Sequence, residues 1–556
     1  MASKPAAVRT LGGVRLLRGL DSAALEELAR RAETVSLEAG SYLFRSGDAA
    51  HELYVVQSGR LRVLVDAGDG PRIARELGPG EAVGELALLT GSARSASVQA
   101  VRDSELLAID ATLFDTLLRD DLAFSRMLVR ELARQLQVSR GIDAPSTRPR
   151  VFSIVPLAPH VDVDPLVAGM ERELSRFGSV DSLRGAESAD GPAAALARAE
   201  AACDAVLLVA GRDPTWDAFC RRQGDRTVLV ADQMTPPADA SGCDLVLYAP
   251  MPTGATRRWL DETRPAAHHL VYDVAFDVGA ARVARRLAGR SLGVVLSGGG
   301  ARGLAHIGAI AALTEAGFDI DRIGGCSIGA LIAGLAALGL DADQIRERCR
   351  AELVDRKPFN DWTLPRVALI RSRKAERMLQ RLFGELQVEE LPRPFFTVSA
   401  DLVSTHTVVH RTGPLVEAVG ASMSIPGLAP PRASGRQLLI DGGVLNNLPV
   451  DLMAESREGP VVAIDVVRRL DLDAPGAARS LPPIMETMTR ATVLGSAERA
   501  ERNRALATLV ISPDLHGIGL RDFAVLDQAI AIGRAAGEAA LQEDGAALRS
   551  ALQGPA

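Results

Sequence analysis

The feature that most limits the fold of this chain is a cluster of glycines between an apolar run and a helical pattern. In SLGVVLSGGGARGLAHIGAIAALTEAG, Leu292 to Leu296 reads as a buried strand, and apolar residues recur at helical spacing from Leu304 to Ala311. Glycines let the backbone approach a ligand closely, and the N–H groups of a helix start attract negative charge. The pattern predicts a strand, a loop that can meet a ligand, and a helix.

Taken alone, this loop has two interpretations. It also fits a dinucleotide-binding turn, because Asp319 and Asp321 stand near the spacing of a ribose-binding acid. The motif that follows, GCSIG at residues 325 to 329, favours another chemistry. A GxSxG turn between a short strand and a helix projects a serine hydroxyl above the sheet. Ser327 is therefore the candidate nucleophile, and redox chemistry with a nicotinamide cofactor is the least favoured hypothesis.

A serine nucleophile needs a base. None of the eight histidines lies in an obvious strand-end motif after Ser327, and His306 on the first helix is interpreted as a packing or solvent-facing residue. The better candidate is Asp441, which ends the apolar strand Leu438 to Ile440 and precedes two glycines. Its alternative role is that of a turn residue closing a hairpin.

These three loops follow one another in the order seen in a known family. GGGARG (298–303), GCSIG (325–329) and DGG (441–443) resemble the oxyanion, nucleophile and dyad-aspartate motifs of the patatin-like phospholipases. ASMSIPGLAPP (421–431) and NNLPVD (446–451) match the surrounding stretches, so the resemblance covers at least residues 291–455. It implies a serine acyl-ester hydrolase with a Ser-Asp dyad, without a catalytic histidine, a metal or a required cofactor. The residues it implies are the catalytic Ser327 and Asp441, an oxyanion loop of Gly298, Gly299, Gly300, Ala301, Arg302 and Gly303, the elbow glycines Gly325 and Gly329, and Gly442 and Gly443 after the aspartate.

The role of Arg302 stays open among three alternatives. It orients the loop, attracts a lipid phosphate, or forms a surface ion pair at the helix start.

The N-terminal region has a different pattern. Short apolar runs separated by glycines at nearly regular intervals predict an antiparallel barrel or roll with flanking helices. Within it, VGELALLTGSARSASVQA (83–100) resembles the phosphate-binding cassette of cyclic nucleotide-binding domains, although Ala93 stands where many binders have proline. The implied effector is cyclic AMP or cyclic GMP; the alternative is a fold retained for interdomain packing. The implied nucleotide-binding residues are Gly84, Glu85, Leu86, Ala87, Arg94 and Ser95.

The chain is thus predicted to be multidomain. We expect a cyclic nucleotide-binding-like β-roll at 12–140, a linker at 141–150, an α/β spacer domain at 151–288 and a patatin-like α/β hydrolase domain at 291–556. The spacer has Val- and Leu-rich runs typical of buried parallel strands, but no phosphate-binding glycine loop.

A sensor domain followed by a patatin domain resembles the neuropathy target esterase family of lysophospholipases. The implied substrates are lysophospholipids, phospholipids and related esters at a membrane surface. The alternative is a cyclic nucleotide-binding sensor whose hydrolase-like domain is not catalytic.

Composition and charge bear on partners and location. A net charge of -7 disfavours nucleic acid as a partner. The sequence shows no signal peptide and no apolar run long enough to span a bilayer. Five cysteines without paired spacing fit a reducing cytoplasm. The basic stretch 366–381, with interleaved apolar residues, is either an ordinary exposed helix or a peripheral contact with the inner face of a membrane. Acyl-chain preference, headgroup and oligomeric state stay open.

Overall fold

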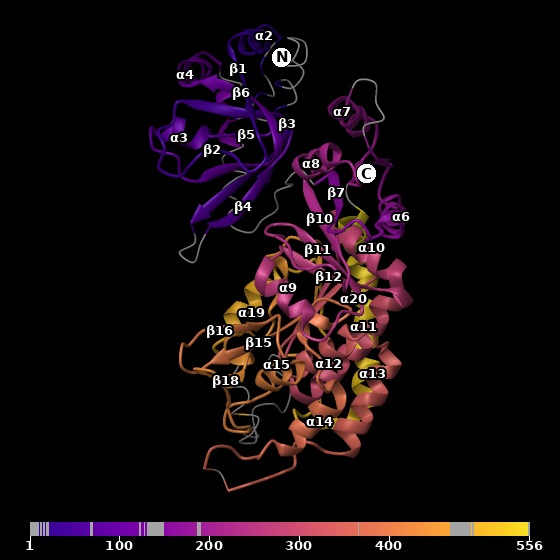
Figure 1. Ribbon diagram of the computed structural model, residues 1–556. Coiled ribbons are helices and arrows are strands. Elements are labelled where there is room, and N and C mark those ends of the chain that lie inside the picture. Colours follow the sequence, from indigo (N-terminus) through magenta and orange to yellow (C-terminus); the bar gives the residue numbers. More distant parts are fainter. Residues whose placement is uncertain are drawn as a thin grey trace. The chain divides into compact units, whose positions relative to one another are not determined.

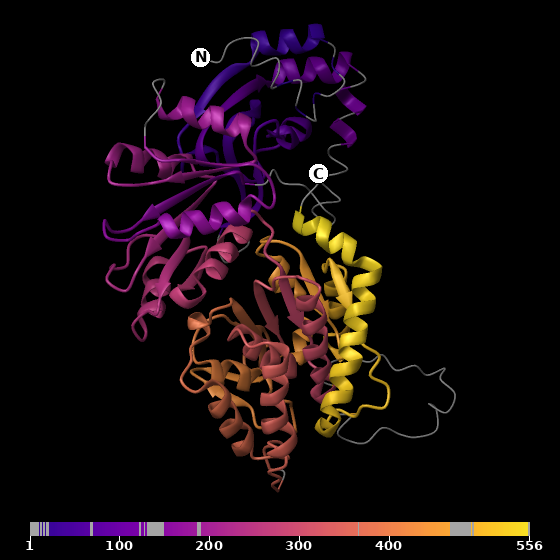
Figure 2. The same cartoon turned by 90° about the vertical axis from the view of Figure 1, so that its right-hand side faces the viewer.

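The chain forms two compact units. The computed structural model describes residues 22–66, 71–121, 124–126, 128–130, 149–185, 191–364, 366–467 and 494–553, with the single residues 11, 14, 17, 20, 487 and 491. Unit 1 comprises residues 1–167 and 178–230, and unit 2 comprises residues 168–177 and 231–556. Figures 1 and 2 show the elements of both units from two sides.

Unit 1 begins with an antiparallel β-roll flanked by helices. Its strands are ordered β1-β6-β3-β4, with β2 paired to β6 and β5 paired to β3. The alternating burial along β6 is that of a strand with one face on a core. The elements are α2 (Ser22–Arg31), β1 (Glu33–Leu37), β2 (Tyr42–Phe44), β3 (Glu52–Asp66), β4 (Pro71–Leu77), β5 (Ala82–Val83), α3 (Glu85–Thr90), β6 (Ser97–Asp110) and α4 (Ala111–Asp120).

The rest of unit 1 is a parallel α/β arrangement with strand order β10-β7-β9-β8. Its strands are buried runs of Val, Leu and Ile, as the sequence predicts for parallel strands covered on both faces. The predicted spacer, 151–288, is shared between the two units, and its limits stay a prediction. The elements are β7 (Val151–Pro156), α6 (Asp164–Leu174), β8 (Val180–Leu183), α7 (Pro192–Ala202), β9 (Ala205–Val209), α8 (Pro214–Gln223) and β10 (Arg226–Ala231), with the end of α6 lying in unit 2.

A buried carboxylate joins the two parts of unit 1. Asp225, at the start of the β10 segment, is paired with Arg60 of β3 (Nε to Oδ1, 3.1 Å) and Arg102 of β6 (Nε to Oδ1, 3.0 Å). Its Oδ2 accepts from the backbone N–H groups of Arg150 (2.8 Å) and Val151 (3.1 Å). Burial alone would raise the pKa of Asp225, but Arg60 and Arg102 lower it below its ordinary value. Charge and hydrogen bonds therefore fasten the β-roll to the segment that holds the parallel strands.

Unit 2 is organised around an eight-stranded mixed sheet. Its order is β17-β18-β15-β14-β13-β19-β20, with β16 paired to β15. The parallel strands β11 and β12 pair with each other and precede this sheet in the chain. The elements before the sheet are β11 (Asp244–Ala249), α9 (Ala255–Thr263), β12 (Ala267–Tyr272), η2 (Asp273–Ala275) and α10 (Phe276–Leu287).

The remaining elements of unit 2 alternate strands and helices. They are β13 (Gly293–Leu296), η3 (Gly300–Leu304), α11 (Ala305–Glu315), β14 (Arg322–Gly325), α12 (Ile328–Ala337), α13 (Ala342–Cys349), the π-helix η4 (Arg350–Asp355), α14 (Arg373–Phe383), η5 (Val388–Glu390), β15 (Phe395–Asp401), β16 (Thr407–His410), α15 (Leu415–Ser422), β17 (Arg432–Ser434), β18 (Gln437–Asp441), α16 (Gly443–Asn446), α17 (Val450–Ala454), β19 (Val461–Ile464), α19 (Ala497–Arg504), β20 (Leu509–Ile511), η6 (Phe523–Val525) and α20 (Leu526–Gln553).

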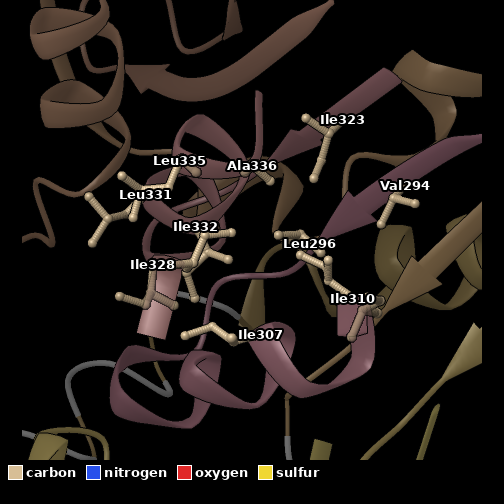
Figure 3. Close-up of a cluster of buried hydrophobic side chains, with 14 of the residues drawn as sticks. Val294, Leu296, Ile307, Ile310, Ile323, Ile328, Leu331, Ile332, Leu335 and Ala336 are labelled. Atoms are coloured by element: carbon tan, nitrogen blue, oxygen red, sulfur yellow. The ribbon is translucent and has the colours of Figure 1, made fainter. Parts of the chain in front are cut away.

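The core of unit 2 lies where α11 and α12 pack on the centre of this sheet. Figure 3 shows side chains of both helices turned toward Val294 and Leu296 of β13 and Ile323 of β14. Every residue of α12 is buried, so its contacts with its surroundings are apolar on all sides. This packing fixes the strand ends from which the two glycine-containing loops depart.

The strand register also brings Asp441 close to the end of β14, although β18 runs antiparallel to β15. Asp441 lies opposite Ser399, two residues beyond Thr397, which pairs with Gly325 at the end of β14. A chain entering from the opposite direction therefore still ends beside the turn that holds Ser327.

The basic stretch is helical over a shorter range than its amphipathic pattern indicates. The helix α14 begins at Arg373, whereas Trp362 and Ile370 form an antiparallel bridge. Backbone hydrogen bonds across that bridge replace the helical ones before Arg373. Within the part of the chain that the structure describes, no helix is both long enough and apolar enough to cross a bilayer.

We expect Asp225→Ala to lower the free energy of unfolding of unit 1 by about 3 kcal/mol, because the buried Arg60 and Arg102 would each lose a carboxylate partner and keep Glu76 and Glu200. Urea unfolding followed by circular dichroism measures the change. Asp217→Ala is the matched control, since its pair with Arg221 is exposed and is worth at most about 0.5 kcal/mol.

The lowered pKa of Asp225 also predicts how its stabilisation of the fold changes with pH. The stabilisation is complete above the unfolded-state pKa of about 3.9 and is lost as the pH falls through the folded-state value. Equal losses for Asp217→Ala and Asp225→Ala would contradict the buried network.

Candidate active site

The loop after β13 is held by neighbouring backbone. Gly298 N–H donates to Asn447 O (3.2 Å), and Ala301 N–H donates to Leu520 O (2.8 Å). Gly300 has φ 58°, and a Cβ there would lie 2.3 Å from Leu520 O, so only glycine fits. Two of the predicted oxyanion amides are thus already engaged, whereas Gly300 lines the same pocket as Ser327.

Arg302 is buried in this loop. Its side chain is 6% exposed, and Nε donates to Ile518 O (2.8 Å). This buried position is not that of a surface residue, and the bond to Ile518 O fits the alternative in which Arg302 orients the loop. Gly303, the last residue of the predicted oxyanion loop, packs against Ile328 of α12.

Ser327 occupies a strained turn between β14 and α12. Its φ of 56° and ψ of -123° are rarely adopted by a residue with a side chain, and such strain persists where the surroundings over-determine it. Its backbone N–H donates to Ser422 Oγ (2.9 Å). A Cβ at Gly329 would lie 2.5 Å from Leu296 O, so the turn closes this tightly only with glycine there. Gly325 packs on Gly329 in the same way.

Asp441 lies buried beside this turn. Its carboxyl lies beside the Ser327 side chain, and Oδ1 accepts from Gly443 N–H (2.8 Å) and from Cys326 Sγ (3.6 Å). Burial raises the pKa of Asp441 to about 6, while Ser327, Gly443 N–H and Cys326 act in the opposite direction by favouring the carboxylate. Gly442, the other predicted glycine after the aspartate, packs against Val398 O of β15.

The histidines that the sequence offered are engaged elsewhere. His306 is fully buried with Nε2 2.9 Å from Ser297 O, and burial lowers its pKa to about 4. His410 Nε2 lies 2.7 Å from Ser399 Oγ. Among the described residues that line the pocket with Ser327, none is a histidine. Of the candidates that the sequence suggested, Asp441 is the titratable group that lies beside Ser327.

The pocket in front of Ser327 is apolar along most of its lining. Its cavity volume is about 140 Å3. Charged side chains are present too, because Glu376, Arg432 and Arg521 take part in the lining. Such a site can take an acyl chain beside the serine. The apolar residues lining it are Ile328, Phe359, Ile370, Ala375, Met378, Leu379, Met423, Ile425, Leu428, Ala429, Pro430, Pro431, Leu520 and Phe523.

Three residues at this site were not singled out from the sequence. Ser422 holds the Ser327 amide, Cys326 contacts Asp441, and Asn447 both accepts from Gly298 N–H and donates Nδ2 to Gly298 O (3.3 Å). These residues lie in the segments that resemble the family, GCSIG, ASMSIPG and NNLPVD. The sequence alone did not predict their contacts. Asp321, suggested for a ribose, instead pairs with Arg285 (Oδ1 to Nη2, 2.7 Å) and accepts from Leu292 N–H. That acid is part of the framework of unit 2.

The predicted nucleotide cassette is a separate site in the β-roll. Arg94 is 5% exposed, with Nη1 donating to Gly84 O (3.0 Å) and Nη2 to Glu52 O (2.7 Å). Its guanidinium carbon lies 4.2 Å from the centre of the Phe44 ring. Burial lowers the pKa of Arg94. Both Nη atoms are thus bonded to carbonyls of the β-roll, whereas Nε is a buried donor without a partner among the described residues.

The other cassette residues surround this arginine. Glu85 and Ala87, in the short helix α3, are buried, whereas Leu86 is 45% exposed. Ser95, next to Arg94, is exposed. The structure therefore brings Gly84 into contact with Arg94 while leaving two of the six predicted residues on the surface.

Comparison with known proteins agrees with both resemblances. The model of the patatin-like phospholipase family matches residues 294–454, and that of the cyclic nucleotide-binding domain matches residues 34–121. An NTE family protein of Mycobacterium tuberculosis is 36% identical, over 96% of this chain and 96% of its own length.

Two further proteins match this chain over smaller shares of both chains. Lysophospholipase NTE1 of Cryptococcus neoformans is 29% identical over 77% of this chain, which spans 32% of that protein. The regulatory domain of Toxoplasma gondii PKA with cAMP is 29% identical, covering 25% of this chain and 54% of its own, with a TM-score of 0.22. The predicted fold class is confirmed, and the chain belongs to the NTE family, with a cyclic nucleotide-binding domain and a patatin-like phospholipase domain.

Proposed function

We propose that this protein is a serine acyl-ester hydrolase that cleaves lysophospholipids at a membrane surface through a Ser327-Asp441 dyad. The observation that carries the proposal is the buried Asp441 carboxyl, which lies beside Ser327 at a strained turn that opens on an apolar pocket. The similarity to the lysophospholipase of Cryptococcus neoformans supports the substrate class. From the lining of the pocket, we expect the acyl chain to lie among Met378, Leu379 and Leu428.

The chemistry follows from the positions of these groups. Ser327 Oγ attacks the ester carbonyl while Asp441 takes its proton, giving a tetrahedral intermediate. The amides of Gly298 and Ala301 are engaged, so we assign the oxyanion to Gly299 and Gly300 N–H, each worth about 3 kcal/mol in comparable hydrolases. The intermediate collapses as Asp441 returns the proton to the departing alcohol. Water, deprotonated by Asp441, then releases the fatty acid from Ser327.

A second function, an effector site in the β-roll, has its own supporting observation. Arg94 carries a buried Nε without a partner among the described residues and stacks near Phe44, at the place where the cassette would receive a phosphate. The effector class is a cyclic nucleotide, and we propose that its binding alters ester hydrolysis. A phosphate at the Nη atoms would replace a carbonyl of Gly84 or Glu52, so we expect affinity no tighter than about micromolar.

We expect Ser327→Ala and Asp441→Asn to lower hydrolysis of lysophosphatidylcholine by at least about a thousandfold, because each removes one half of the dyad. Fatty-acid release by purified protein measures this. The matched controls are Ser434→Ala and Asp514→Asn, both exposed, which should keep wild-type rates. Full activity in Ser327→Ala would refute the dyad.

The raised pKa of Asp441 predicts the pH dependence. A base must be deprotonated to act, so kcat/KM should rise with pH, with a midpoint at about pH 6, and level off at higher pH. Cys326→Ala removes a donor that favours the carboxylate, so the midpoint should move to higher pH. Cys349→Ala, equally buried elsewhere in unit 2, should leave it in place. A midpoint that stays fixed or falls in Cys326→Ala would contradict this assignment.

Cyclic nucleotide binding is tested by calorimetry with cyclic AMP and cyclic GMP on the full chain. We expect heat of binding for one of them, loss of that heat in Arg94→Ala, and retention in Arg45→Ala, whose guanidinium lies over Tyr42 outside the cassette. Hydrolysis assayed with and without the bound nucleotide then tests regulation. Absence of binding by the wild type would leave the β-roll with a packing role.

A further inference from the structure

A short loop beside the pocket exposes large apolar side chains. We define the rim loop as residues 359–364 and 366–372. Trp362 is 49% exposed, Leu364 is 85% exposed and Val367 is 73% exposed. In Figures 1 and 2 this segment projects beyond α14, at the end of unit 2 away from α10. Apolar side chains gathered in this way are costly in water and mark an interaction surface.

Backbone hydrogen bonds hold the rim loop in place. Thr363 N–H donates to Leu369 O (2.9 Å), and Arg371 N–H donates to Asp361 O (3.0 Å). Ile370 N–H donates to Leu428 O (2.9 Å), which ties the loop to the wall of the pocket. The exposed side chains are therefore presented by a fixed backbone.

The rim loop is continuous with the pocket. Phe359 and Ile370 line the pocket near Ser327. Arg521, also in the lining, donates to Phe359 O (3.3 Å) and lies with its guanidinium carbon 4.6 Å from the centre of the Trp362 ring. Leu402 and Val403 are exposed too, but they do not line this pocket. The apolar surface thus leads into the pocket.

Basic residues flank the exposed apolar side chains along the chain. The acids of residues 359–377 are Asp361 and Glu376, and Glu376 lies 3.8 Å from Arg432. Basic residues outnumber them, and all are exposed. They are Arg366, Arg371, Arg373, Lys374 and Arg377.

We propose that the rim loop is the membrane-docking element of this protein, which inserts Leu364, Val367 and Trp362 into an anionic phospholipid bilayer. Arg366, Arg371, Arg373, Lys374 and Arg377 then meet the lipid phosphates. Apolar tips flanked by cations match the layered chemistry of a bilayer surface, hydrocarbon below phosphate. The inference deepens the proposed function, on which it rests: a lipid would pass from the bilayer along Phe359 and Ile370 to Ser327.

Tryptophan fluorescence provides a direct test. The chain has three tryptophans, and Trp216 and Trp259 are 3% and 0% exposed, so Trp362 is the one that can change its solvent contact. The full-length Ser327→Ala variant, which leaves lipid intact, is mixed with vesicles of phosphatidylcholine alone or with about a third phosphatidylglycerol. We expect a blue shift and protection from acrylamide with the anionic vesicles, and neither in Trp362→Phe.

Vesicle sedimentation separates the apolar and charged contributions. Leu364→Ser with Val367→Ser should weaken binding by at least about tenfold, and Arg373→Gln with Arg377→Gln by roughly tenfold or more, the latter effect fading at high salt. The matched control is Val274→Ser with Val278→Ser, exposed apolar residues at and near the start of α10, which should bind like the parent. Unchanged binding in the rim variants, or equal loss in the control, would overturn the proposal, as would binding to a protein but to neither vesicle.

Activity measurements keep this proposal distinct from the proposed function. With Ser327 restored, Leu364→Ser/Val367→Ser should hydrolyse a dissolved short-chain ester at the wild-type rate and lysophospholipid in anionic vesicles at least about tenfold more slowly. If the wild type cleaves neither substrate yet binds vesicles through the rim loop, the hydrolase assignment fails and the docking element stands. If both substrates are cleaved equally by wild type and variant, the docking element fails and the hydrolase stands.

Discussion

The placement of Ser327 beside the buried carboxyl of Asp441 is the arrangement on which the candidate site depends. In water an aspartate has a pKa of about 3.9 and is a weak base toward a hydroxyl. Complete burial without donors would keep it protonated at neutral pH and useless as a base. Here the donors Gly443 N–H, Cys326 Sγ and Ser327 offset part of the burial and leave the pKa at about 6. The carboxyl is therefore ionised near neutral pH, yet more basic than an exposed aspartate.

That placement requires Ser327 to hold a backbone conformation that its own side chain disfavours, at a cost of about 1–3 kcal/mol. The turn cannot relax, because α12 begins at the next residue and is buried along its whole length. The Ser327 amide is fastened to Ser422, at the end of α15, and Asp441 N–H donates to Ser424 O just beyond it. One short segment thus restrains both members of the dyad. A change that loosened residues 422–424 would separate the serine from its base without touching either.

The sequence allowed prediction of those features that depend on local pattern. Alternating apolar runs predicted the β-roll and the parallel strands, and glycine spacing placed the loops around Ser327 and Asp441. What it could not provide depends on residues far apart in the chain. The engagement of Gly298 by Asn447 and of Ala301 by Leu520 spans 149 or more positions, and Arg94 bonds to a carbonyl 42 positions away.

The rim loop shows the same limit of sequence reasoning. Amphipathic spacing favours a helix from residue 366. Periodicity could not show the backbone bonds that flank the Trp362–Ile370 bridge, or the bond from Ile370 to Leu428. The helix α14 begins only at Arg373, where that bridged segment ends. Tertiary hydrogen bonds therefore decided both the start of the helix and the exposure of the apolar side chains before it.

The distribution of charge would also orient the protein at an anionic membrane through the rim loop. The whole chain carries a net charge of -7, so an anionic membrane repels most of its surface. Screening restricts each charge to a range of about 8 Å at physiological salt, so only the charges nearest the lipid act on it. A face bearing Arg366, Arg371 and Arg373 is then attracted while other faces are not. Because Phe359 and Ile370 of the same loop line the pocket, the attraction that brings the protein to a bilayer would also turn the pocket toward it.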